Sequence, residues 1–108
     1  MFSLTNENVA ASFSAIGSPA RLAVLAALLR RGEIGLTVGA LQARLAMPAS
    51  TLAHHLGALV RAGVVTQTKV GRTVTNRAHL DHLASLAEFL LAECGQDAHL
   101  TNQGSADD

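Results

Sequence analysis

The chain has 108 residues, of which 49% are hydrophobic and none is Trp or Tyr. This length and composition predict one domain, with a core of Leu, Ala and Val in packed helices. The formal net charge is zero, yet all eight lysines and arginines lie within residues 21–77, which contain a single acidic residue, Glu33. That segment therefore carries a charge of +7, eight cations less one anion, which favours a nucleic-acid partner. A single cysteine excludes an internal disulfide and a classical zinc-finger cluster.

Two helices are predicted before residue 32. Apolar residues recur at helical spacing over about 6–16, and Thr5 or Asn6 can cap the first turn. The pair Ser18-Pro19, a cap followed by proline at the first helical position, begins a second helix that runs to about Arg30. Four leucines of this second helix are expected to face the core: Leu22, Leu25, Leu28 and Leu29.

The next segment is predicted to form a helix, a tight turn and another helix. The Thr37 hydroxyl can accept a hydrogen bond from the first helical turn, and apolar residues follow at helical spacing. Pro48 cannot lie inside a helix, and it pushes Met47 into an extended conformation. The predicted bounds are 37–45 for the first helix, 46–48 for the turn, and Ala49 or Ser50 to a stop at Gly63 for the second helix.

The second of these helices has two unlike faces. One face is apolar and carries Leu52, Leu56, Leu59 and Val60, whereas the other is short and polar and carries Ser50, Thr51, His54, Gly57, Ala58 and Arg61. A helix packed only for stability would carry Glu, Lys or Gln on its wet face. Hydroxyls and an imidazole can instead reach phosphates or base edges in a major groove. The expected DNA contacts are Ser50, Thr51, His54 and Arg61, and His55 is expected to be a hydrogen-bonded, half-buried support.

Two stretches rich in β-branched residues, 64–68 and 73–75, flank a basic turn that contains glycine. This pattern predicts a β-hairpin that forms a wing. Lys69, Arg72 and Arg77 are expected to contact phosphates or to enter a minor groove. The alternative is a solvated hairpin whose charges only maintain solubility, and the neighbouring pair of helices makes that alternative less favourable.

Three stretches, at this spacing and in this order, carry a resemblance to a known family: residues 17–22, residues 50–56, and residues 62–65 followed by Gly71-Arg72. Over roughly residues 5–95 the chain resembles the ArsR family of winged-helix repressors. The resemblance implies a mainly α fold with a small β-hairpin, a winged helix-turn-helix of four helices, a two-stranded wing and a fifth helix. It also implies transcriptional regulation through double-stranded DNA.

The last predicted helix, residues 79–94, has an apolar seam. Leu80, Leu83, Ala87, Leu90 and Cys94 follow one another at three, four, three and four residues, which suits packing against another helix. In proteins of this resemblance the first and last helices pair two subunits. We therefore expect a homodimer whose interface includes this seam and Phe13, presenting two recognition helices to an inverted repeat. The alternative is that the helix packs only on its own domain.

Regulators of this family are usually released from DNA by a metal, a metalloid or an oxidant. The arsenic-type thiol motif would fall on residues 41–44, which contain no cysteine. The zinc-type motif begins with an Asp, which Asp81 matches, and a His, which Leu83 replaces here. Its two later ligands lie thirteen and sixteen positions after the Asp, where this chain has Cys94 and Asp97. The low-ranked candidate ligands are His79, Asp81, His82, Cys94 and Asp97.

The favoured interpretation of these residues is structural, with Asp81 capping the helix, His82 solvated and Cys94 a small apolar residue. Cys94 also leaves open an oxidant switch through sulfenic acid or an intersubunit disulfide. We therefore assign no cofactor and leave Zn(II) or another inducer open.

The leading functional prediction is a homodimeric repressor of transcription. The alternative is a winged-helix protein-interaction module with weak DNA binding, which the neutral net charge suggests, as does Gly57, at a position that is commonly Lys in the family. An enzyme is not predicted, because no nucleophile with a base, phosphate-cradling loop or carboxylate pair emerges.

The remaining features concern the chain's organisation and location. The longest apolar run, Leu22 to Leu29, is too short to span a membrane, and we expect no targeting segment and a cytoplasmic protein with no membrane partner. From Gln96 onward apolar periodicity is lost. We therefore expect one DNA-binding and dimerisation domain over residues 1–95 and a disordered polar tail over 96–108.

Overall fold

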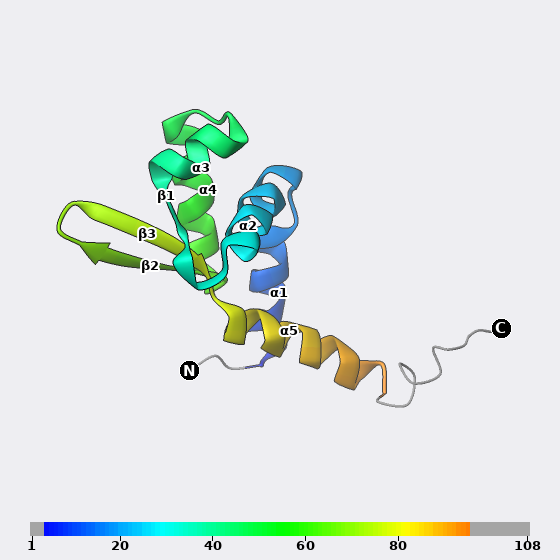
Figure 1. The fold of residues 1–108 in the computed structure, drawn as a ribbon. Helices are drawn as coiled ribbons and strands as arrows, with labels where there is room; N and C mark the ends of the chain where they lie inside the picture. The colour runs from blue at the N-terminus through cyan, green and yellow to red at the C-terminus, as the bar shows by residue number, and fades with distance from the viewer. Residues whose placement is uncertain (1–3, 96–108) are drawn as a thin grey trace.

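The fold combines five α-helices with a small sheet, and the computed structural model describes residues 4–95. The elements are α1 (Asn6–Ile16), α2 (Pro19–Arg31), a 3-10 turn η1 (Gly32–Ile34), β1 (Leu36–Thr37), α3 (Val38–Leu45), α4 (Ala49–Arg61), β2 (Val65–Val70), β3 (Thr73–Ala78) and α5 (Leu80–Glu93). Figure 1 shows the turn between α3 and α4 at one end, the β2–β3 hairpin projecting to one side, and α5 leaving the body at the opposite end. This is the predicted winged helix-turn-helix. The tail predicted over 96–108 lies outside the described residues.

Hydroxyl side chains begin three of the helices, as predicted. Thr5 Oγ1 accepts from Asn8 N at 3.1 Å, Ser18 Oγ from Arg21 N at 3.1 Å, and Thr37 Oγ1 from Ala40 N at 3.2 Å. Each such cap contributes about 1 kcal/mol to helix stability. α4 instead begins after Pro48 with no side-chain cap, and Ala46 makes the preceding turn with a left-handed φ of 50°.

The core lies between α2 and α4 and is closed by α1, α3 and the start of β2. Its fully buried side chains include Val24, Leu28, Leu41, Leu52, Leu59 and Val64. The prediction that four α2 leucines face the core is half wrong, because Leu22 and Leu29 are 52% and 45% exposed. These two leucines are seven residues apart and therefore share one helix face, whereas α2 packs through the face that carries Val24 and Leu28.

The sheet has three antiparallel strands in the order β1-β3-β2, so the predicted two-stranded wing, β2 and β3, is confirmed and a third strand that was not predicted is added to it. The missed strand β1 has two residues, which pair Leu36 with Asn76 and Thr37 with Thr75. The buried Asn76 side chain joins all three strands, since its Nδ2 donates to the Leu36 carbonyl at 3.1 Å and its Oδ1 accepts from Gln67 at 2.8 Å. The hairpin strands are also longer than predicted and reach Val70 and Ala78.

Gly35 allows β1 to approach β3. Its φ is 73°, and a Cβ placed there would lie 2.6 Å from the Asn76 carbonyl oxygen. Gly71, at the wing tip, has a φ of 61° but no atom within 4 Å of such a Cβ. Both glycines thus need a positive φ, but only at Gly35 would an added Cβ collide with neighbouring atoms.

Gly35→Ala should lower the free energy of unfolding by about 3 kcal/mol or more, because strain and a backbone clash add. Gly71→Ala, which adds strain alone, should cost about 1 kcal/mol. Urea midpoints at fixed m-value measure both effects. Equal losses in the two variants would contradict the close approach of β1 and β3.

A hydrogen-bonded junction attaches the start of α5 to the rest of the domain. The His79 N–H donates to the Val64 carbonyl at 2.9 Å, and its Nδ1 lies 3.0 Å from the Gly63 carbonyl, which can only accept. His82 Nε2 lies 2.9 Å from Ser12 Oγ of α1. Both His82 and Ser12 are buried, so the predicted solvated His82 is wrong. Ser12, which contacts His82 in the folded protein, lies 70 residues away from it in the sequence.

Burial lowers the pKa of His82, and the charge of the neighbouring His79, whose ring centroid is 5.6 Å away, lowers it further. Unfolding restores the ordinary value of 6.5, so the unfolded chain binds more protons than the folded one just below that pH. The stability due to neutral His82 is therefore complete above about pH 6.5 and is lost as the pH falls through the lower folded-state pKa.

His82→Gln should reduce the loss of stability between pH 7.5 and pH 5.5, because the amide can still donate to Ser12 but does not titrate. His54→Gln is the matched control, since His54 is exposed. Urea unfolding at the two pH values measures the effect. An unchanged pH dependence in His82→Gln would contradict this assignment.

Candidate nucleic-acid interface

α4 presents the two faces that the sequence predicts. Leu52, Leu56 and Leu59 are buried, and Val60 packs partly against the same core. Ser50, Thr51 and His54 are exposed on the other side of the helix. We call these three residues the reading face. Their side chains are short or planar, so a nucleic-acid groove could approach the helix backbone closely.

His55 lies beside the reading face and is half-buried, as expected. Its ring centroid is 5.8 Å from that of His54. The expectation that the His55 ring is hydrogen-bonded fails at one atom, because its buried Nδ1 has no hydrogen-bond partner within residues 4–95.

The wing presents its cations at the tip. Lys69 and Arg72 are exposed on either side of the turn, and neither forms an ion pair within the part of the chain that the structure describes. Arg77 differs, since its Nε donates to the Glu33 carbonyl at 2.7 Å and its Nη1 to Thr68 Oγ1 at 3.1 Å. Arg77 therefore joins the base of the wing to η1, a contact that no local sequence pattern indicates.

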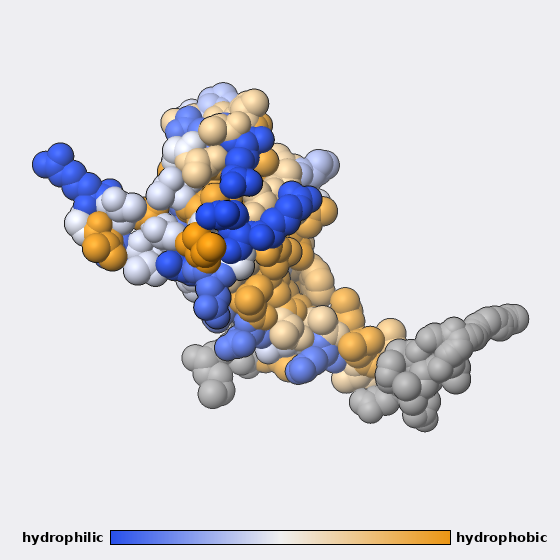
Figure 2. Space-filling model, in the orientation of Figure 1, coloured by the Kyte–Doolittle hydropathy of each residue, from blue (hydrophilic) through white to orange (hydrophobic). Residues whose placement is uncertain are grey.

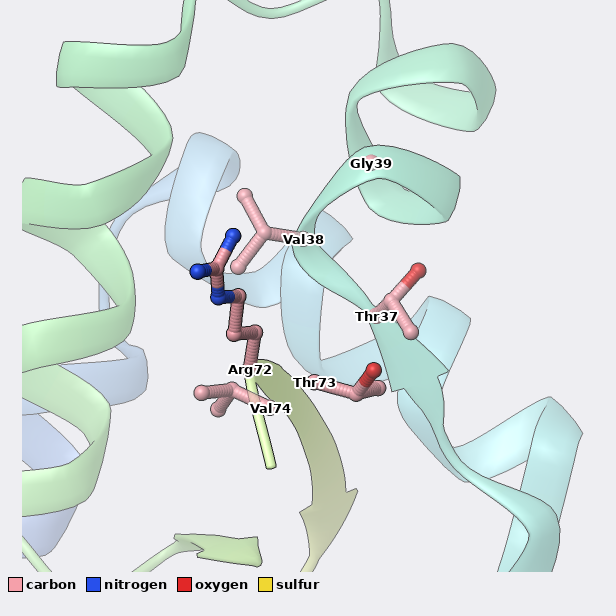
Figure 3. A pocket seen from close by; sticks show the side chains of 6 residues that line it. All are labelled: Thr37, Val38, Gly39, Arg72, Thr73 and Val74. Atoms are coloured by element: carbon pink, nitrogen blue, oxygen red, sulfur yellow. The ribbon is translucent and has the colours of Figure 1, made fainter. Parts of the chain in front are cut away.

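A hollow of about 340 Å³ lies between the wing and the start of α3. Its lining residues are Thr37, Val38, Gly39, Arg72, Thr73 and Val74. Figure 3 shows the Arg72 side chain extending from the wing toward Val38, with the Thr37 and Thr73 hydroxyls on the other side of the opening. The hollow is thus lined by one guanidinium and two hydroxyls, which are groups that can donate hydrogen bonds to a phosphate.

Arg61 lies at the opposite end of α4 from Ser50. It is exposed, and its Nη1 is 3.2 Å from the position that a Cβ on Gly57 would take. The guanidinium thus lies along the helix, one turn back toward the reading face.

α5 carries an exposed apolar face. Leu80, Ala87, Leu90 and Cys94 of the predicted seam are exposed, and Figure 2 shows apolar surface continuing along this helix. Leu83 is half-buried and packs against the domain's own core together with Leu86 and Phe89. Phe13 also packs partly on that core. One part of the seam therefore packs on the chain's own core, and the other part stays exposed in a single chain. The exposed apolar residues of the seam are Leu80, Ala87 and Leu90.

Among residues 4–95, the candidate metal ligands do not form a site within one chain. Residues 4–95 contain no group of three His, Cys, Asp or Glu side chains placed to hold a metal ion. His82 is buried against Ser12, so it does not fit the role of a replacement ligand. His79 shares this junction, Asp81 and Cys94 are exposed, and Asp97 lies outside the described residues.

No single helix within residues 4–95 is long and apolar enough to cross a membrane. α1 and the segment Pro19–Ile34 reach the length and apolar composition of a membrane span only when they are taken together, and the chain bends by 93° between them.

Comparison with known proteins places these features in context. Residues 16–68 match a family of helix-turn-helix domains. An ArsR-like transcriptional regulator from Rhodococcus sp. RHA1 is 28% identical, with a TM-score of 0.72, and the match covers 89% of this chain and 92% of that one. HlyU from Vibrio cholerae is 28% identical, with a TM-score of 0.67, covering 83% and 96%.

A homodimeric winged helix-turn-helix DNA-binding domain from Mycobacterium bovis has a TM-score of 0.65 at 23% identity, covering 95% of this chain and 96% of that one, and it supports the fold. A search of curated protein sequences gave no match.

Proposed function

Because the chain is an ArsR-like winged helix-turn-helix protein, with the family and fold of DNA-binding transcription regulators and not of enzymes, we propose that it is a homodimeric repressor that binds an inverted-repeat operator. The observation that carries this proposal is the reading face of α4, where Ser50, Thr51 and His54 are exposed over a fully apolar inner face. Occupation of a promoter by two such helices would exclude the transcription machinery without catalysis.

The proposed division of labour follows from side-chain chemistry. The hydroxyls and imidazole of the reading face contact base edges, whereas Lys69 and Arg72 at the wing tip contact phosphates. Arg77 supports the wing from its base through bonds to Glu33 and Thr68.

Dimerisation through α5 supplies the second reading helix. An exposed stripe of leucines and alanines on a helix that leaves the body is costly in water, and a second copy of the same stripe would cover it. A homodimeric protein of the same fold supports this arrangement. Release by a metal or an oxidant stays a prediction of the family resemblance, and Cys94, at the exposed end of α5, is the chain's single thiol.

Arg72→Ala should weaken binding to all duplexes. It should also reduce the slope of log affinity against log salt concentration by about 0.9, the value for one phosphate contact. His54→Ala should weaken binding to the operator about tenfold and leave binding to random DNA unchanged. Fluorescence anisotropy on both duplexes at several salt concentrations measures the two effects. Identical losses on both duplexes in the two variants would contradict the proposed roles, and a folded wild-type protein with no selectivity would favour an interaction module.

Leu90→Glu should convert the dimer to a monomer, because it places a charge in the proposed interface without touching the core. Leu22→Glu on α2 is the matched control, since Leu22 and Leu90 are 52% and 48% exposed. Leu83→Glu is less informative because Leu83 also packs on the core. Sedimentation velocity measures the state of each variant, and a dimeric Leu90→Glu would refute the interface.

A further inference from the structure

Two arginines line a hollow at the edge of α4 that the reading face and the wing do not use. The hollow, of about 370 Å³, lies where the end of α1, the start of α2 and the second half of α4 meet. Arg21 and Arg61 are its charged lining residues, and the others are small: Ala11, Ser14, Ala15, Ala58 and Ala62. The volume falls at the lower end of the range for sites that take small molecules, about 300–1,000 Å³.

Arg21 is fixed in place by the end of α1. Its Nε donates to the Ala15 carbonyl, and its Nη2 lies 3.5 Å from the Ser14 carbonyl. Nη1 makes no hydrogen bond to the described residues. Stabilising a helix C-terminus is an ordinary role for a cation and accounts for two of the three guanidinium nitrogens.

That ordinary role does not account for Arg61. Although Arg61 is the last residue of α4, its Nη1 is placed back along the helix beside Gly57, 3.2 Å from where a Cβ would be. It donates to none of the carbonyls of the described residues. Gly57 costs α4 about 1 kcal/mol in helix propensity, and the absence of a side chain there leaves the guanidinium room to lie against the helix.

No carboxylate neutralises this pair of cations within residues 4–95. Glu7 shares the α1 face of Ala11 and Ser14, but seven residues separate it from Ser14, which is about 10 Å along a helix. Two guanidinium groups that line one hollow with small walls suit an anion with several oxygens, because the Arg61 guanidinium can donate two parallel hydrogen bonds and Nη1 of Arg21 can donate as well.

We propose that Arg21 and Arg61 form a binding site for a phosphate group at the edge of the reading face of α4. The phosphate belongs either to the backbone of bound DNA or to a free phosphorylated compound. The first source deepens the proposed function and rests on it, and the second does not.

The test compares Arg61→Gln and Arg21→Lys with the wild type, using the full chain. Arg61 is exposed, so its variant should fold, and Arg21→Lys keeps a cation at the end of α1 while removing the Nη1 donor that the α1 carbonyls leave for an anion. Arg30→Gln is the matched control, since it removes an exposed arginine of α2 outside the hollow. Circular dichroism confirms that each variant is folded.

One arm measures the salt dependence of binding to a random duplex. If the phosphate belongs to DNA, Arg61→Gln should reduce the slope of log affinity against log salt by about 0.9. Arg21→Lys should weaken binding about threefold or more at fixed salt, and Arg30→Gln should change neither the slope nor the affinity.

The other arm measures thermal unfolding without DNA, in sodium phosphate against sodium chloride at equal ionic strength. If the phosphate is free, phosphate should raise the wild-type Tm by more than that of Arg61→Gln, so that general salt effects cancel.

An effect in either arm supports the site and identifies the source of the phosphate. No difference between Arg61→Gln and Arg30→Gln in both arms would overturn the site. If the wild type binds no duplex, the proposed function fails, and the arm without DNA alone decides this inference.

Discussion

The burial of one face of α4 determines how the rest of the molecule can act. Leu52, Leu56 and Leu59 are almost completely removed from water in the core that α2 lines, and each contributes about 1.5–3 kcal/mol. Because successive residues of a helix are about 100° apart, fixing these three leucines also fixes which side chains face outward. The exposure of Ser50, Thr51 and His54 is therefore a consequence of core packing.

The same constraint leaves α5 with two functions. Its inner face carries the buried Leu86 and His82, and the start of the helix is held to α1 by the contact of His82 with Ser12 and to residues 63 and 64 by the bonds of His79. Its outer face carries the exposed Leu90 and its neighbours, which the proposed dimer would cover. Ser12 lies between these parts, since its Oγ is 2.9 Å from His82 and 3.3 Å from the Ala62 carbonyl. Ser12 thus links the start of α5 to the residue that follows α4.

Local sequence signals predicted the helices well, because caps and turns act over three or four residues. Thr5, Ser18 and Thr37 begin helices as expected, and the strong apolar pattern of α4 determined its inner face. The features that sequence analysis missed depend on residues far apart in the chain. β1 exists only through its pairing with β3, and Asn76 reaches across 40 residues to Leu36. The reading face proposed for DNA was predicted from the local pattern of α4, whereas the hollow proposed for phosphate exists only where α1, α2 and α4 meet, which local patterns cannot indicate.

The central claim is that two copies of α4 read an inverted repeat, and selection from a random duplex library followed by footprinting tests it most directly. The account predicts that the wild-type protein enriches a two-fold symmetric sequence and protects two half-sites about one helical turn, roughly 10 base pairs, apart. Enrichment of a single asymmetric half-site, or of no sequence at all, would contradict it.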